Sequence, residues 1–325
     1  MPEKRFFSRL RGVWRRRPSW FMPLALFLAT CCTTTFVGYI TYSGGSLARA
    51  LWFSAPLMTI LSIHELGHYL QLKRYRIDST LPYFLPVPIP PLGTFGAIIR
   101  MRQSLPNRRA LFDVGVSGPV AGLVASLVFL ALGLSMSEIA TAPPTDEMSG
   151  VTFGAPIIMR AFTVAFLGDG SDGARFVLMH PCAVAAWVGL FLTALNLIPV
   201  GQLDGGHAIY ALLGKRSTIV SVVVLVALCV LATLYRYWGW FVFVGLLAVL
   251  GFRRYATRDD TRPLGAFRTV CGWALLAYLV VGFTPSPMMI DETVVSSERS
   301  EAQEAPVLEH DVAPGPLIFH IGQSF

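Results

Sequence analysis

The most informative stretch of this chain is Leu61-Ser62-Ile63-His64-Glu65-Leu66-Gly67-His68-Tyr69-Leu70. On a helix, the four-residue spacing places His64 and His68 on one face about one turn apart, where two neutral imidazoles can bind one metal ion. Glu65 lies beside them and is a candidate general base. The stretch therefore predicts a zinc site carried by a helix.

The sequence around this motif is that of a membrane helix. From Ala50 to Leu72 the surrounding residues are almost all apolar, and the segment is long enough to cross a bilayer. An ionised side chain at the centre of a membrane helix costs about 2.5–3.5 kcal/mol on insertion scales. Because Glu65 carries this penalty, we interpret it as a functional residue.

The composition is that of a polytopic membrane protein. Of the 325 residues, 54% are hydrophobic and 14% are charged, and the mean hydropathy is +0.58. This balance argues against a soluble domain. The five cysteines show no metal-ligand spacing, so we interpret them as small core residues and not as a disulfide framework.

Part of the net charge of +7 comes from a basic cluster at the start of the chain. Seven basic residues precede Trp20, namely Lys4, Arg5, Arg9, Arg11, Arg15, Arg16 and Arg17. Such a cluster beside an apolar segment sets membrane orientation, and no aromatic-interleaved basic surface indicates nucleic acid binding. We therefore expect residues 1–19 to be a basic cytoplasmic arm. The apolar run that follows is too long for the core of a cleaved signal peptide.

The alternation of apolar segments and basic loops predicts an all-α polytopic membrane protein with about seven transmembrane helices. The expected spans are residues 20–41, 50–72, 110–136, 176–198, 218–235, 238–252 and 267–283. They form a transmembrane domain over residues 20–283, and the N-terminus is expected in the cytoplasm. Residues 137–175 should lie outside, with an interfacial or partly inserted helix at 151–167. Residues 284–325, rich in acid, serine and proline, should be a disordered extracytoplasmic tail.

This topology fixes the depth of the metal motif. The span at 50–72 returns to the cytoplasm, where Lys73 and Arg74 follow it. His64 and His68 lie four to eight residues before the end of that span, so at 1.5 Å per residue the metal would lie about 6–12 Å inside the membrane. The site is therefore expected within the membrane near its cytoplasmic side.

Residues 81–101 are apolar but contain five prolines, which forbid a regular helix. Non-helical backbone at membrane depth is tolerated only where protein buries it or where it lines a wet cavity. We therefore predict a re-entrant, proline-rich hairpin beside the metal. The alternative is a cytoplasmic loop that lies on the membrane surface.

A second polar stretch, from Asn196 to His207, follows the fourth span at the same predicted depth. A catalytic zinc needs a third protein ligand and an open position. Asp204 is the better candidate, since a carboxylate near the membrane is costly without a cation, and His207 is its rival. Alternatively, these residues only cap helices. Asn196 is a candidate for binding a developing oxyanion or the substrate backbone, and interhelical packing is the other reading.

Three glycines in the third span, Gly115, Gly118 and Gly122, are predicted to be close-packing positions against a neighbouring helix. Gly118 and Gly122 have the G-x-x-x-G spacing that allows helix backbones to approach. This interpretation requires no chemistry at the three positions.

The chain resembles a known family through three motifs, which occur in order on the expected spans. These are His64-Glu65-Leu66-Gly67-His68, Gly93-Thr94-Phe95-Gly96-Ala97, and Asn196-x-x-Pro199 followed by Leu203-Asp204-Gly205. Together they resemble the site-2-protease family of intramembrane zinc metalloproteases, in its bacterial type without a PDZ domain. The match covers about residues 50–211.

The resemblance implies one Zn²⁺ per chain, held by His64, His68 and Asp204, with Glu65 activating a water. It also implies that a substrate strand pairs beside the proline-rich hairpin, at the positions Gly93, Thr94, Phe95 and Gly96. The expected activity is regulated intramembrane proteolysis, the cleavage of a peptide bond within or near the transmembrane segment of a substrate.

The partners that the resemblance implies are the lipid bilayer and membrane-anchored protein substrates, anti-sigma-factor-like regulators among them. The expected location is a bacterial inner membrane, with the N-terminus cytoplasmic and the C-terminus extracytoplasmic. Two alternatives stay open: a membrane metal or ion transporter, and a catalytically silent membrane scaffold. Because the polar residues cluster at one depth and form no path across the bilayer, the sequence argues against a transporter.

Overall fold

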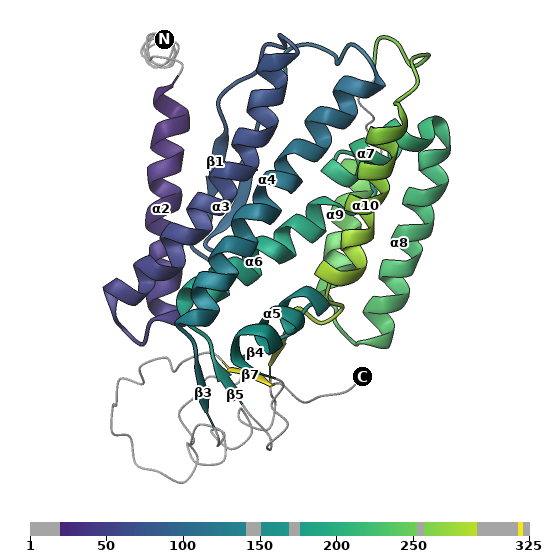
Figure 1. Ribbon diagram of the computed structural model, residues 1–325. Coiled ribbons are helices and arrows are strands. Elements are labelled where there is room, and N and C mark those ends of the chain that lie inside the picture. The colour runs from purple at the N-terminus through teal and green to yellow at the C-terminus, as the bar shows by residue number, and fades with distance from the viewer. Residues whose placement is uncertain (1–19, 141–150, 169–175, 252–256, 291–317, 321–325) are drawn as a thin grey trace, which may run out of the picture.

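The computed structural model describes residues 20–140, 151–168, 176–251, 257–290 and 318–320. Within these ranges the chain is mostly helical (Figure 1). The α-helices are α2 (Phe21–Tyr42), α3 (Leu47–Arg74), α4 (Arg108–Ser135), α5 (Ile157–Leu167), α6 (Pro181–Asn196), α7 (Asp204–Leu213), α8 (Ser217–Leu234), α9 (Gly239–Gly251) and α10 (Ala266–Gly282). A 3₁₀ turn, η1 (Gly214–Arg216), joins α7 to α8. The predicted basic arm lies outside the described residues.

In the described part of the chain, four helical segments are long and apolar enough to cross a membrane: α2, α3, α4 and the continuous stretch Asp204–Leu234. The helices α5, α6, α9 and α10 are apolar but shorter. Length and composition thus support four of the expected seven spans. The predicted span at 176–198 is wrong at its start, because Phe176–Leu178 forms strand β5 and α6 begins only at Pro181. Proline suits this first helical position, since its fixed φ is helical and it lacks a donor that would have no partner there.

The helices α3, α4 and α6 form the centre of the bundle, with α2 on one side and α7 to α10 on the other (Figure 1). Their contact faces are buried at Phe53 of α3, Leu130 of α4 and Trp187 of α6. The helices α4 and α6 approach closely because Gly133 has no side chain, and a Cβ there would lie 2.2 Å from the Ala183 amide nitrogen. Close packing of small residues thus holds the centre of the bundle together.

The start of α4 holds α7 in place. Asn107 caps α4, since its Oδ1 accepts a hydrogen bond from the Ala110 amide at 3.0 Å. Arg108 then donates to the Ala211 carbonyl of α7 at 2.5 Å. One turn further along α4, Asp113 accepts two hydrogen bonds from Arg268 of α10, at 2.7 and 2.9 Å. The Arg108 bond thus holds α7, the helix that begins with the candidate ligand Asp204, against α4, and the Asp113–Arg268 pair holds α10 there.

The proline-rich stretch folds as an antiparallel hairpin of β1 (Tyr83–Pro86) and β2 (Thr94–Ile98). The hairpin lies along α2 (Figure 1). The Thr33 hydroxyl of α2 donates to the Gly93 carbonyl at 2.7 Å, and the Tyr42 hydroxyl at the end of α2 donates to the Pro91 carbonyl at 2.7 Å. The hairpin tip is therefore bonded to a helix that is long enough to cross a membrane.

A second sheet lies at the end of the bundle away from the start of α2 (Figure 1). Its five strands are, in spatial order, β3 (Glu138–Ala140), β5 (Phe176–Leu178), β7 (Ile318–His320), β4 (Val151–Phe153) and β6 (Met288–Ile290). The all-α expectation therefore needs correction, because the helical bundle carries two small sheets. The stretch expected as one interfacial helix, 151–167, contains both β4 and α5, and the tail expected to be disordered contributes β6 and β7. Residues 291–317 and 321–325 of the tail lie outside the described residues.

Candidate metal centre

The helix α3 brings the two motif histidines together. It runs without interruption from Leu47 to Arg74, so the i, i+4 spacing of His64 and His68 places both rings on one face. Their Nε2 atoms lie 3.1 Å apart. His64 is buried, and His68 is enclosed between α3 and α4 through its contact with the backbone of Val114.

Asp204, the first residue of α7, completes a three-residue cluster. Its Oδ2 lies 3.3 Å from the Nε2 atom of His64 and 3.3 Å from that of His68. Zinc binds imidazole nitrogen and carboxylate oxygen at about 2.0–2.2 Å in a tetrahedral arrangement, which separates ligand atoms by about 3.3–3.5 Å. The three donor atoms therefore have the chemistry and spacing that fit one zinc ion. Among the described residues, these three form a group whose ligand atoms all lie within 4.8 Å of one another and could hold a metal ion.

A backbone carbonyl orients the second histidine. The Nδ1 atom of His68 lies 2.7 Å from the Val114 carbonyl of α4. A carbonyl oxygen only accepts hydrogen bonds, so Nδ1 carries the proton in this contact. The lone pair of Nε2 is then directed at Asp204 and is available to a metal, which is the usual second contact of a metal-binding imidazole.

Glycines of α4 make room for the histidine rings. A Cβ at Gly118 would lie 2.1 Å from the Nε2 atom of His68, and a Cβ at Gly122 would lie 2.9 Å from the Nδ1 atom of His64. The close-packing prediction for these glycines is therefore confirmed. The groups that pack against Gly118 and Gly122 are the two imidazole rings themselves, so the close approach of α4 leaves the space that these rings occupy. Gly115 lies in the same way against His207.

The first prediction is that Gly118→Ala lowers zinc affinity by at least about tenfold, because the new methyl group occupies the space next to the metal-binding nitrogen of His68. The matched control is Gly245→Ala in α9, where a Cβ would meet no heavy atom within 4 Å. Zinc affinity is measured by competition with a chelator on both purified variants. Equal affinity of Gly118→Ala and wild type would contradict this account of the α3–α4 contact.

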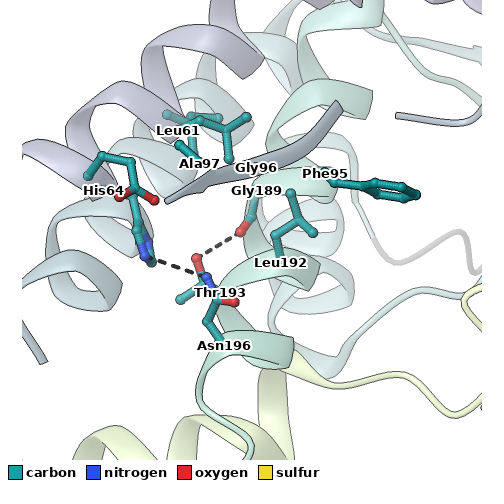
Figure 2. Close-up of a pocket in the computed structure, with 11 residues that line it drawn as sticks. Leu61, His64, Phe95, Gly96, Ala97, Gly189, Leu192, Thr193 and Asn196 are labelled. Atoms are coloured by element: carbon teal, nitrogen blue, oxygen red, sulfur yellow. Dashed lines mark hydrogen bonds between the residues drawn. The ribbon is translucent and has the colours of Figure 1, made fainter. Parts of the chain in front are cut away.

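A pocket opens beside the cluster (Figure 2). It is lined by Ile60, Leu61, His64, Glu65, Phe95, Gly96, Ala97, Gly189, Leu192, Thr193 and Asn196. Figure 2 shows His64 facing Thr193 and Asn196, whereas the ring of Phe95 points away from them. The pocket thus joins α3, the strand β2 and α6 at one place, with the candidate general base Glu65 in its wall.

The structure brings most of the sequence-predicted residues to this place. Asn196 lies near the cluster, with its Nδ2 3.5 Å from the Nε2 atom of His64. Among the predicted hairpin residues, Phe95 and Gly96 line the pocket. Thr94 turns inward and donates to the Leu85 carbonyl at 3.0 Å, so it holds the hairpin together. Gly93 packs against α2, where a Cβ would lie 2.7 Å from the Thr34 Cα.

The sequence did not settle the places of His207 and Thr193. His207, the rival ligand, lies against Gly115 of α4 and is not part of the three-residue cluster found among the described residues. Thr193 lines the pocket, but the sequence analysis did not select it. The sequence could have identified Thr193 from its position three residues before Asn196, since residues three apart share a helix face.

The cluster of two histidines and an aspartate, with a glutamate in the adjoining pocket and helices able to cross a membrane, is typical of a membrane metallohydrolase. The comparisons with known proteins agree: residues 52–234 match the model of peptidase family M50, and the chain belongs to this family.

Several curated relatives of the chain are plant proteins. It is 34% identical over 200 residues to "Probable zinc metalloprotease EGY1, chloroplastic" of Arabidopsis thaliana, covering 60% of this chain and 36% of that protein. It is 28% identical over 253 residues to "Probable zinc metalloprotease EGY3, chloroplastic" of Oryza sativa subsp. indica, covering 71% of this chain and 41% of that protein. The chain therefore spans well under half the length of these relatives. No solved structure is significantly similar to it.

Proposed function

We propose that this chain is an intramembrane zinc metalloprotease that cleaves a peptide bond within or next to the transmembrane segment of membrane-anchored protein substrates. The observation that carries the proposal is the meeting of His64, His68 and Asp204 at 3.1–3.3 Å. Two of these residues belong to α3 and the third begins the stretch Asp204–Leu234, and both segments are long and apolar enough to cross a membrane. Membership of peptidase family M50 supports the same activity.

The proposed chemistry assigns a role to each residue of the pocket. His64, His68 and Asp204 would hold Zn²⁺, which when bound supplies Lewis acidity and a water whose pKa is about 7. Glu65 accepts the proton of the attacking water and later returns it to the leaving amine. Asn196 offers its Nδ2 as a hydrogen-bond donor to the carbonyl oxygen of the scissile bond.

The hairpin is the proposed docking element for the substrate. Among the strands that the structure describes, β2 pairs with β1 alone, and its residues Phe95, Gly96 and Ala97 line the pocket. A helical substrate hides its carbonyls in intrahelical hydrogen bonds, and an added strand on β2 would replace the bonds lost on unwinding. We propose that the hairpin is re-entrant, supported by its bonds to Thr33 and Tyr42 of α2.

The second prediction concerns the substrate. Glycine in a helix costs about 0.8–1.0 kcal/mol relative to alanine, so a span containing two glycines unwinds more readily than one containing two leucines. Replacing both glycines near the scissile bond with leucine should slow cleavage by about tenfold. Cleavage rates of the two substrates in proteoliposomes measure this effect. Equal rates would contradict local unwinding as a requirement.

The proposed setting is a bacterial inner membrane with seven crossings, the N-terminal side cytoplasmic and the metal near that side. The opposite directions of successive helices and the basic residues after α3 and before α4 support this orientation. The curated relatives, by contrast, are named as chloroplastic. Anti-sigma-factor-like membrane regulators are the proposed substrate class.

One experiment tests the proposed function. The zinc-loaded chain is reconstituted in liposomes with a single-span model substrate that contains two glycines, and cleavage and ion flux are followed together. We expect chelator-sensitive cleavage without flux. Flux without cleavage would replace the protease proposal with a transporter, and neither activity in the zinc-loaded chain would favour a silent scaffold.

A further inference from the structure

The five-stranded sheet consists of two separate ribbons joined by one strand. The ribbon β3–β5 pairs antiparallel, and so does the ribbon β4–β6. Strand β7 lies between them, antiparallel to β5 with Val177 opposite Phe319, and parallel to β4 with Thr152 opposite Ile318. Without β7, the sheet order β3-β5-β7-β4-β6 leaves the two ribbons unpaired with each other.

The ribbon β4–β6 is anchored to the helices independently of β7. The Trp187 indole of α6 donates to the Gly154 carbonyl at 2.9 Å, directly after β4. The Trp240 indole of α9 donates to the Pro285 carbonyl at 2.6 Å, shortly before β6. The Gly154 amide in turn donates to the Pro287 carbonyl at 3.1 Å. Two buried tryptophans, one in the N-terminal half of α6 and one at the start of α9, therefore fix this ribbon to the helices.

The ribbon β3–β5 is anchored in its own way. It lies between the end of α4 and the start of α6, and the His180 amide donates to the Ser137 hydroxyl at 3.0 Å where the two strands meet these helices. Val177 and Met179 are 1% and 3% exposed, so the β5 segment is packed into the core. Both ribbons are thus held by the bundle, and the space between them has the width of one strand, with about 4.7–4.9 Å to each neighbour.

Strand β7 comes from a distant part of the sequence. Residues 291–317 separate it from β6. Each of the other four strands is joined to a helix of the bundle by a short connection. Strand addition is held by main-chain hydrogen bonds, so it accepts different extended sequences with β propensity. The sequence Ile318-Phe319-His320 has that propensity.

We propose that the space between β4 and β5 is a peptide-binding site that accepts an extended apolar segment on both edges, and that residues 318–320 fill it in cis. Its ligand in trans is an extended, β-forming peptide. If the proposed proteolytic function holds, the segment of a substrate that leaves the membrane at this end is such a peptide, and it competes with β7. The binding site itself does not depend on proteolysis, and its test measures binding alone.

The test uses a chain that ends at Gly315 and the full chain, both in detergent with their zinc. The probe is a fluorescein-labelled peptide with the sequence of residues 316–322, Pro-Leu-Ile-Phe-His-Ile-Gly. We expect saturable binding to the shortened chain, and binding to the full chain that is weaker by at least about tenfold, because the tethered strand competes at high effective concentration. The matched control peptide carries Phe319→Pro, which removes a main-chain donor and should not bind.

Three results would overturn the proposal: equal binding to both chains, equal binding of the proline peptide, or no binding to a shortened chain that retains its zinc. If the shortened chain loses its zinc, the full chain with Val177→Cys and Phe319→Cys replaces it. The two paired positions should then form a disulfide within the chain. Peptide at high concentration should lower the fraction of the chain that forms this disulfide. Absence of that disulfide, or a yield unaffected by the peptide, would also overturn the proposal.

Discussion

Glu65→Gln should lower kcat/KM for peptide cleavage by about 10²–10⁴-fold while the chain keeps about one zinc ion. Glutamine has nearly the same shape as glutamate but cannot accept the proton of the attacking water. The three candidate ligands are other residues, so the metal should stay bound. The measurements are single-turnover cleavage of the model substrate and zinc content by elemental analysis.

The matched control for this variant is Glu138→Gln, the same change at an exposed residue of β3. It should leave both cleavage and zinc unchanged, because β3 belongs to the sheet at the far end of the bundle. Wild-type activity in Glu65→Gln would refute the assignment of Glu65 as the base. Loss of zinc from it would instead show that Glu65 holds the metal.

The double variant His64→Ala, His68→Ala should lose its zinc altogether. Only Asp204 of the three ligands would remain, and a single carboxylate does not hold zinc at low free concentration. Wild-type chain purified in detergent should contain about one zinc per chain, and the double variant should contain none. Cleavage should fall to background with the metal.

The control here is His180→Asn at the start of α6. His180 caps that helix by accepting a hydrogen bond from the Cys182 amide at 3.3 Å, and asparagine can serve the same role. This variant should therefore keep both its fold and its zinc. Zinc retained by the double variant would show that the metal binds elsewhere. Absence of zinc from carefully prepared wild type would remove the metal from the proposal.

The sequence alone predicted the helix that carries the site. The spacing of His64 and His68 and the apolar segment around them are local properties, and a continuous helix turns this spacing into one shared face. The three long apolar segments corresponding to α2, α3 and α4 were predicted for the same reason. The sequence also predicted that the proline-rich stretch forms a hairpin, because repeated prolines exclude a regular helix.

Short strands were not predictable in the same way. The strands β3, β4, β5, β6 and β7 have three residues each, which is too few to show a periodicity of two. Their pairing joins Phe176 to His320 across a long stretch of sequence. No local pattern encodes such a contact, so both the expected start of the fourth span and the all-α class were wrong in part.

Sequence alone identified the residues that could carry the chemistry, since residue type and helical spacing are local properties. Which of these residues meet depends on how the helices pack. Asp204 and His207 both lie in the first turn of α7. The hydrogen bond from Arg108 to Ala211 and the close approach at Gly115 set where that helix lies, and Gly118 sets the approach of α4 to His68. The physical reason is that the position of a side chain across a helix contact depends on how closely two backbones approach, which no single segment specifies.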